Sequence, residues 1–98
     1  MTTKQRAALR SMAATMEPIL HIGKDGITPP VIKQCWDALE ARELIKVTVQ
    51  RGAPYTAREA CDELCGQVHA EPVQVIGNRF VIYREAREDS RIHLDELG

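Results

Sequence analysis

The sequence predicts an α/β fold, a compact single domain in which three helices pack on a mixed four-stranded sheet. Segments with the apolar spacing of helices alternate with short strand-like segments, in the order α-β-α-β-α-β-β. The length of 98 residues suits one domain. A domain of that size has a radius of gyration of about 13 Å. The sequence contains no internal repeat or low-complexity segment that would indicate a second unit.

The first helix is expected to begin after Thr2, because its hydroxyl and the side chain of Gln5 have the spacing of a capping box. Pro18 is expected to end this helix. Residues 19–22 then form a short strand, and residues 23–26, Gly-Lys-Asp-Gly, form a turn. Within the helix, apolar residues recur at the i, i+3, i+4, i+7 positions of one buried side: Leu9, Met12, Ala13 and Met16.

The second helix is expected to begin after Thr28, since Pro29 suits the first helical position, where a missing amide costs nothing. The helix runs to about Arg42. Residues 44–50 alternate between apolar and polar side chains, which is typical of a half-buried strand, and residues 51–54 break that strand. The apolar face of the helix consists of Val31, Cys35, Ala38 and Leu39.

Thr56 and Glu59 have a second capping-box spacing, which places the start of the third helix. Residues 72–76 and 79–83 are strand-like runs separated only by residues 77–78, Gly-Asn, so a tight antiparallel hairpin is expected. One side of the third helix is apolar and consists of Ala57, Ala60, Cys61, Leu64, Cys65 and Val68.

The charges are unevenly distributed, although the formal net charge is −1. Residues 1–36 carry five cations and two anions, whereas residues 85–98 carry two cations and five anions. The latter also lack apolar periodicity, so we expect a polar, acidic, mobile tail at 85–98 beyond a folded domain of residues 1–84. Because a polyanion responds to the local potential, the low net charge disfavours a strong non-specific DNA coater but does not exclude nucleic-acid binding by a small basic face.

The composition disfavours several classes of protein. No apolar run approaches the roughly 20 residues of a membrane span. The first residues lead into an amphipathic pattern, not into the apolar core of a signal peptide. The three cysteines are an odd number without the spacing of a disulfide framework, which favours a reducing compartment. We therefore expect a cytoplasmic protein without a membrane contact.

The sequence contains no convincing catalytic or metal site. Cys61, Cys65 and His69 fall on one helix face, but eight residues of helix span about 12 Å, which is too far for one ion. Core packing as small hydrophobic side chains is the favoured interpretation of the cysteines. No nucleophile motif or paired carboxylates are found. We expect neither a cofactor nor a metal, and a small hydrolase is the weakest of the functional hypotheses.

The turn at residues 23–26 is the most informative candidate site. It lies between a strand and the start of a helix, where unpaired amides and the helix dipole attract anions. Its glycines permit close approach of a phosphate and left-handed backbone angles, and Lys24 supplies a cation. A GxxG loop clamps the nucleic-acid backbone in KH modules. The same pattern also describes a plain strand-to-helix turn, so both interpretations stay open.

Two further side chains have both a functional and a structural interpretation. His21, next to the turn, either hydrogen-bonds a phosphate or simply faces solvent. Trp36 lies beside the apolar stripe of the second helix. Its ring either packs at the edge of the core or stacks on a base or a partner protein. The structural interpretation is the simpler one for both residues.

Several segments of the chain resemble the CRM domain, whose name stands for chloroplast RNA splicing and ribosome maturation. Residues 3–6 and 9–10, Pro18, and residues 22–28, Ile-Gly-Lys-Asp-Gly-Ile-Thr, resemble its opening. Residues 38–47 resemble its second helix and strand, and residues 75–84 resemble its closing hairpin. The resemblance covers residues 2–84 and is to the stand-alone bacterial form, the YhbY type.

The resemblance implies a fold similar to the C-terminal domain of translation initiation factor three. It also implies an RNA-binding protein that associates with precursors of the large ribosomal subunit and assists ribosome assembly, with ribosomal RNA and ribosomal proteins as partners. By this analogy, residues 23–26 form the RNA-contacting loop and the basic residues of the first helix flank it. The expected RNA contacts are Gly23, Lys24, Asp25, Gly26, Lys4, Arg6, Arg10 and Lys33, with Arg79 and Arg84 as weaker candidates at the hairpin.

The chain departs from the family pattern in two places. Asp25 puts an anion beside Lys24 and weakens the local field, and neither Trp36 nor residues 51–55 have a counterpart that we can place. The rival hypothesis is a protein-interaction module that uses Trp36 and the acidic tail without touching RNA. The salt dependence of binding distinguishes the two hypotheses, because phosphate contacts are strongly salt-dependent whereas apolar docking is not.

Overall fold

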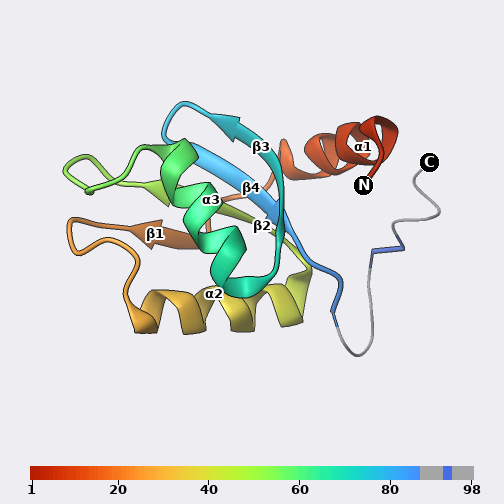
Figure 1. Ribbon diagram of the computed structural model, residues 1–98. Helices are drawn as coiled ribbons and strands as arrows, with labels where there is room; N and C mark the ends of the chain where they lie inside the picture. Colours follow the sequence, from red (N-terminus) through yellow and green to blue (C-terminus); the bar gives the residue numbers. More distant parts are fainter. Residues whose placement is uncertain (87–91, 94–98) are drawn as a thin grey trace.

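The computed structural model describes residues 1–86 and 92–93. Three helices and four strands follow one another in the predicted order (Figure 1). None of the helices in this part of the chain combines the length and the apolar character that a membrane crossing requires. The elements are α1 (Thr3–Ala13), β1 (Leu20–Ile22), α2 (Pro29–Arg42), β2 (Leu44–Val49), α3 (Ala57–Val68), β3 (Glu71–Ile76) and β4 (Arg79–Tyr83).

The four strands form one mixed sheet in the order β1-β2-β4-β3. β1 runs parallel to β2, with Ile22 opposite Val49, and the other two pairs are antiparallel. β3 and β4 form the predicted hairpin, whose turn residue Gly77 has a φ of 55°. Since β4 lies between β2 and β3, the edge strands are β1 and β3. The predicted α/β class and mixed four-stranded sheet are confirmed.

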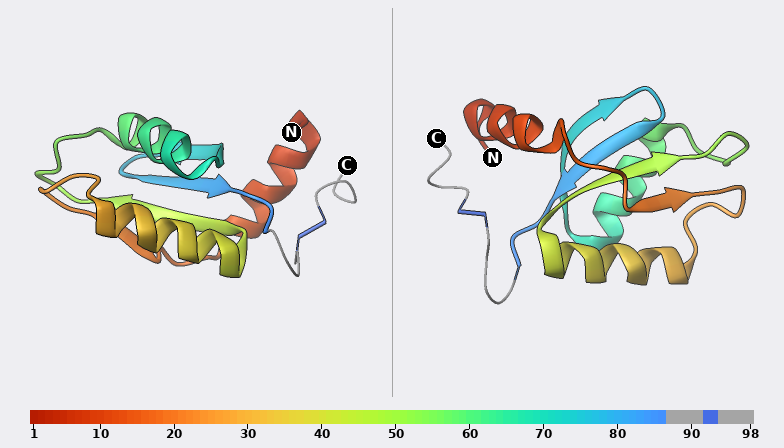
Figure 2. Two further views of the ribbon diagram at one scale, coloured as in Figure 1. Left: turned by 60° about the horizontal axis from the view of Figure 1, so that its bottom comes forward. Right: turned by 180° about the vertical axis from the view of Figure 1, so that it is seen from behind.

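Two hydrophobic clusters flank the sheet. The first lies between the sheet and helices α2 and α3, and contains the fully buried Phe80 and Leu64. The second lies on the other face, where Leu9 of α1 packs with Leu44 and Val81. Figure 2 shows α1 apart from α2 and α3. α1 therefore covers one end of a sheet face that α2 and α3 do not reach.

β2 is more buried at its start than a half-buried strand would be. Leu44 and Ile45 point to opposite faces of the sheet, yet both are buried. Lys46 and Thr48 share the face of Leu44 and are only partly buried. The physical reason is that α1 packs over the beginning of β2 and leaves the rest of that face open.

The start of α1 is as predicted, and its end is not. Thr2 and Gln5 form the capping box, and the equivalent pair, Thr56 and Glu59, forms a second one on α3. α1 ends at Ala13, well before Pro18, because the chain leaves the helix through tight bonds such as that from the Met16 amide to the Ala13 carbonyl (3.0 Å). Met12 is 43% exposed, so the predicted buried stripe narrows to Leu9 and Ala13.

The contacts of the fold continue beyond Arg84. Glu43 follows α2, has a φ of 66° and is fully buried. Its carboxylate accepts hydrogen bonds from the amides of Ala86 and Ile92, each at 2.8 Å. The folded unit therefore includes residues that the sequence assigned to the tail. The remainder of the predicted mobile tail, residues 87–91 and 94–98, lies outside the described residues.

Candidate nucleic-acid interface

Residues 23–26 form the predicted turn, which we call the glycine loop. The Gly26 amide donates to the Gly23 carbonyl at 3.0 Å, and Gly26 has a φ of 75°. A Cβ on Gly26 would lie 3.0 Å from Cε2 of Tyr55 and 3.1 Å from Cγ of Pro54. Glycine is therefore needed at position 26 both for the backbone angle and for the close packing.

The glycine loop packs against the segment that joins β2 to α3, residues 50–56. The Gln50 amide donates to the Ile22 carbonyl at 2.8 Å, just before the glycine loop begins. On the other side, the Val49 amide donates to the Asn78 carbonyl at 2.7 Å. Three loops thus meet at one end of the molecule, the left side of Figure 1. We call it the loop end.

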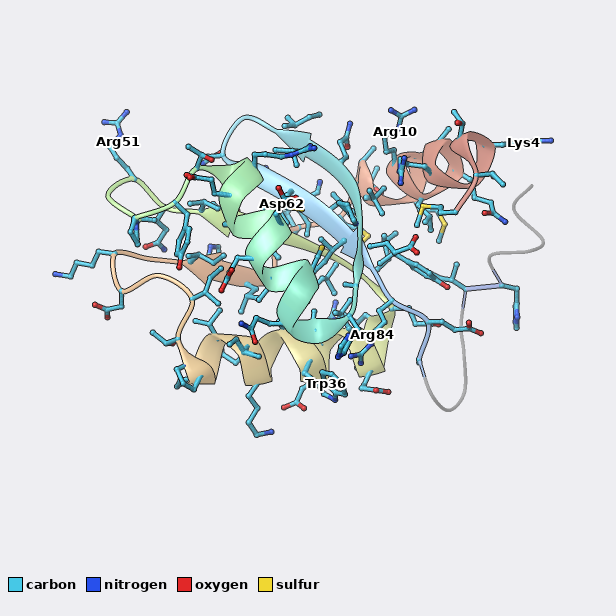
Figure 3. All side chains as sticks on the ribbon, in the orientation of Figure 1. Lys4, Arg10, Trp36, Arg51, Asp62 and Arg84 are labelled. Atoms are coloured by element: carbon cyan, nitrogen blue, oxygen red, sulfur yellow. The ribbon has the colours of Figure 1, made fainter. Side chains whose placement is uncertain are left out.

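The loop end exposes two cations. Lys24 and Asp25 are exposed in the glycine loop, and Arg51 is exposed in the neighbouring segment. Figure 3 shows Arg51 at the edge of the molecule, directed away from the sheet. Sequence reasoning did not assign Arg51 a role. The available signal was a basic residue beside a glycine in the turn that ends a strand.

The helix start beside the glycine loop offers fewer donors than expected. Thr28 is the N-cap of α2 by its extended backbone, but its side chain makes no capping hydrogen bond. Pro29 and Pro30, the first two helical residues, carry no amide hydrogen. The attraction of an anion at this site therefore depends on Lys24 more than on the helix terminus.

The basic residues of α1 do not flank the glycine loop, and that expectation is wrong. α1 packs over Leu44, whereas the glycine loop follows Ile22, which lies opposite Val49. The five steps from Leu44 to Val49 span about 17 Å of strand. Figure 3 shows Lys4 and Arg10 at the opposite end of the molecule from Arg51. Arg6 and Arg10 instead line a hollow together with Arg58 of α3.

Arg84 is occupied within the fold, so we remove it from the candidate RNA contacts. Its Nη2 lies 2.8 Å from Oε1 of Glu40 in α2, and its Nη1 donates to the Val68 carbonyl of α3 at 3.1 Å. Its guanidinium carbon lies 4.1 Å from the centroid of the Trp36 ring, as the two labelled side chains in Figure 3 suggest. Only 11% of the Arg84 side chain is exposed.

The contact with Arg84 also accounts for the position of Trp36. This residue is half-buried and packs against the first hydrophobic cluster. One face of its ring carries Arg84, which favours the interpretation that it packs at the edge of the core. The rival hypothesis of a protein-docking tryptophan loses its main support for this reason.

Lys33, Arg79 and His21 remain exposed. Lys33 forms an ion pair with Asp37 at 2.9 Å, but both side chains are largely in solvent, where such pairs contribute little. Arg79 begins β4 directly after the hairpin turn. His21 lies on the open face of the sheet, opposite Thr48.

The cysteines are free and buried, as their core interpretation predicted. Burial raises the pKa of the Cys35 thiol to about 12, against the opposing charge of Arg84. The hydrogen bond with Cys61 raises the pKa of Cys65 well above its usual range, and burial adds to that effect. Both thiols therefore stay protonated at neutral pH. Among residues 1–86 and 92–93, no group of three His, Cys, Asp or Glu side chains could hold a metal ion.

Comparison with known proteins places the chain in a family. The CRS1 / YhbY (CRM) domain matches residues 1–84. The "Probable RNA-binding protein YqeI" of Bacillus subtilis (strain 168) is 40% identical over 94 residues, covering 96% of this chain and 98% of that protein. An "RNA-binding protein" of Haemophilus influenzae is 32% identical over 94 residues, covering 96% and 94%.

A solved structure agrees with the sequence comparisons. The solution structure of a hypothetical protein from Staphylococcus aureus is 45% identical and superposes with a TM-score of 0.79, covering 95% of this chain and 97% of that one. The resemblance found in the sequence is thus confirmed along nearly the whole chain. This protein belongs to the CRS1/YhbY (CRM) domain family.

Proposed function

We propose that this protein binds RNA through its loop end, with the glycine loop against the phosphate backbone. The observation that carries the proposal is the glycine loop, in which Gly26 packs closely against Tyr55 and Lys24 is exposed. The proposal is supported by the names of two family relatives, "Probable RNA-binding protein YqeI" and "RNA-binding protein".

The proposed contacts are electrostatic and concern the RNA backbone. Lys24 and Arg51 donate to phosphates, Arg79 contributes from the adjoining hairpin, and Lys33 reaches from the outer surface of α2. Gly23 and Gly26 allow the backbone to come close to the RNA. Asp25 limits the local field. Such contacts set affinity and register without reading sequence.

A non-enzymatic role in assembly of the large ribosomal subunit is the biological setting that we propose. The resemblance of the whole folded chain to the YhbY type supports it. The free cysteines suit a reducing compartment, in keeping with a cytoplasmic protein. Tagged protein should co-sediment with precursor particles of the large subunit in a lysate gradient. Migration only at the top of the gradient would contradict this role.

Lys24→Asp tests the site. About three phosphate contacts predict a log–log salt slope of about −2 for single-stranded RNA. The substitution should weaken binding of a fluorescein-labelled single-stranded RNA by about tenfold in fluorescence anisotropy and flatten that slope. Lys24 is exposed and lies in a loop, so the melting temperature should stay nearly unchanged.

The matched control is Arg42→Asp, which makes the same change of charge at the far end of α2. Arg42 is exposed and lies away from the loop end. If Lys24→Asp and Arg42→Asp bind RNA equally well, the glycine loop is not the site. The rival, protein docking through Trp36, would be favoured by a wild-type protein that shows no salt-dependent RNA binding at all.

A further inference from the structure

Two adjoining hollows lie along β3, away from the glycine loop. One, of about 540 Å³, is lined by Arg6 and Arg10 of α1, Arg58 of α3 and residues 72–75 of β3. The other, of about 120 Å³, has six lining residues: Lys46, Gln74, Ile76, Arg79, Phe80 and Val81. Gln74 lines both hollows, so they form one continuous surface. We call it the sheet track.

The sheet track is strongly cationic in a chain whose net charge is −1. No aspartate or glutamate is among the described residues that line it. Within the described part of the chain, Arg58 is the one lining cation with an ion pair, at 3.7 Å from Asp62, and both side chains are more than half exposed. The five cations of the track are Arg6, Arg10, Lys46, Arg58 and Arg79.

The strand register and the packing of α1 account for four of these five charges, whereas the fifth, Arg58, comes from α3. Lys46 pairs with Val81, and Thr48 pairs with Arg79. Their neighbours in the chain point into the core under α2 and α3, so Lys46 and Arg79 point to the opposite, open face. α1 covers only one end of that face and brings Arg6 and Arg10 to its border.

We propose that the sheet track is a second RNA-binding surface, which takes the phosphates of a single-stranded segment apart from the glycine loop. This inference rests on the proposed function. Arginine guanidinium groups match the geometry of phosphate oxygens and bind them with paired hydrogen bonds. Ile76, which is 60% exposed beside Arg79, offers an apolar surface to a base.

The edge of β3 argues for RNA and against an acidic peptide as the occupant. A peptide would gain most of its affinity by adding a strand to this edge. Pro72 lacks the amide hydrogen that such pairing needs, and the register shifts between Pro72 and Gln74. Both features disfavour the addition of a strand. Without strand pairing, an acidic peptide has only its charge to contribute, whereas a single-stranded RNA also carries bases that contact the exposed Ile76.

Two RNA-binding surfaces that meet at Arg79 make the affinity depend on the length of the RNA. An RNA long enough to reach both the loop end and the sheet track gains effective concentration at the second surface. A short RNA gains contacts at one surface only. Substitutions in the two surfaces should therefore each weaken the binding of a long RNA.

Arg10→Glu tests the track, and Arg42→Glu is its control. Both arginines are exposed and lie in the last turn of their helices, so the two substitutions disturb the helix dipole to the same extent. The probe is a fluorescein-labelled single-stranded RNA of about 20 nucleotides, titrated between about 50 and 200 mM salt. Arg10→Gln and Arg42→Gln repeat the comparison, and circular dichroism melts verify folding of all four variants.

Arg10→Glu should weaken binding by about five- to tenfold and reduce the magnitude of the salt slope by about 0.7, the share of one phosphate. Arg42→Glu should remain within about twofold of the wild type. Equal affinities of the Arg10 and Arg42 variants would overturn the sheet track. So would complete displacement of the RNA by poly-L-glutamate at equal charge, which would indicate an acidic-peptide site.

The same titration separates the two proposals. If Lys24→Asp loses affinity for RNA and Arg10→Glu does not, the glycine loop is supported as a binding site and the sheet track is contradicted. If Arg10→Glu loses affinity and Lys24→Asp does not, the sheet track is supported as a binding site and the glycine loop is contradicted. If the wild-type protein shows no salt-dependent binding of RNA, both proposed binding sites are contradicted.

Discussion

Gly26 lies directly against Tyr55, so closely that a methyl carbon on Gly26 would be 3.0 Å from Cε2 of the tyrosine ring. The contact joins two loops that are far apart in the sequence and keeps the glycine loop in place. It connects the segment that most resembles a nucleic-acid clamp to a segment for which the sequence offered no role.

Gly26→Ala should destabilise the protein more than Gly77→Ala. Both glycines have positive φ values, 75° and 55°, so both substitutions carry a backbone cost of about 1–2 kcal/mol. Position 77 has open space for a Cβ, whereas position 26 meets Tyr55 and Pro54. The overpacking should cost Gly26→Ala roughly 1–3 kcal/mol more in urea unfolding. Equal losses would show that the packing against Tyr55 is loose.

Arg84→Lys should lower the free energy of unfolding by about 2 kcal/mol, because lysine cannot keep the bonds to Glu40 and Val68 together. Lys33→Met, which removes the exposed pair with Asp37, should cost less than about 0.5 kcal/mol and serves as the control. RNA affinity of the folded Arg84→Lys protein should match that of the wild type. A selective loss of RNA binding with unchanged stability would return Arg84 to the interface.

Glu43→Gln should loosen the chain around Ala86 and Ile92. The buried carboxylate accepts both amides, and an amide side chain puts an NH2 group where one acceptor oxygen was. We expect a loss of about 1–3 kcal/mol in stability and faster hydrogen exchange at these two amides by NMR. Glu85→Gln, at an exposed position, is the control. Unchanged exchange at Ala86 and Ile92 would contradict the anchoring role of Glu43.

Stability should decrease at alkaline pH through Cys35. Burial raises the pKa of its thiol to about 12, while an unfolded cysteine has a pKa of about 8.5. The unfolded state therefore loses its proton first, and the stabilisation is present below about pH 8.5 and is lost as the pH rises toward 12. Urea unfolding of Cys35→Ala should show a shallower decline between about pH 8 and 10 than the wild type. Parallel declines would assign the effect to other groups.

Features that depend on neighbouring residues could be read from the sequence. The capping boxes at Thr2 and Thr56 and the Gly77-Asn78 hairpin all formed where their patterns predicted them. The glycine loop formed too. Each involves residues within a few positions of one another, so local geometry and hydrogen bonding decide the outcome without help from the rest of the fold.

Features that depend on distant residues could not be read in this way. The family resemblance implies that the cations of α1 flank the glycine loop, yet the packing of Leu9 against Leu44 and Val81 places them at the other end of the sheet. The sequence predicts that Arg84 is available to RNA, whereas its contacts with Glu40 and Trp36 hold it within the fold. No pattern along the chain indicated either arrangement.

The sequence by itself determined the fold class, the order of elements and the glycine loop, because periodicity, caps and turn residues act over a few positions. The resemblance of several segments to the CRM domain indicated the family. Only the tertiary structure decided which charged side chains remain available to a partner. That depends on which strands pair and on which face of the sheet each helix packs, and burial of apolar surface between distant segments decides both. Contacts with α2 and α3 withdraw Arg84 from solvent, whereas the packing of α1 and the strand register bring Arg10, Lys46 and Arg79 to the sheet track.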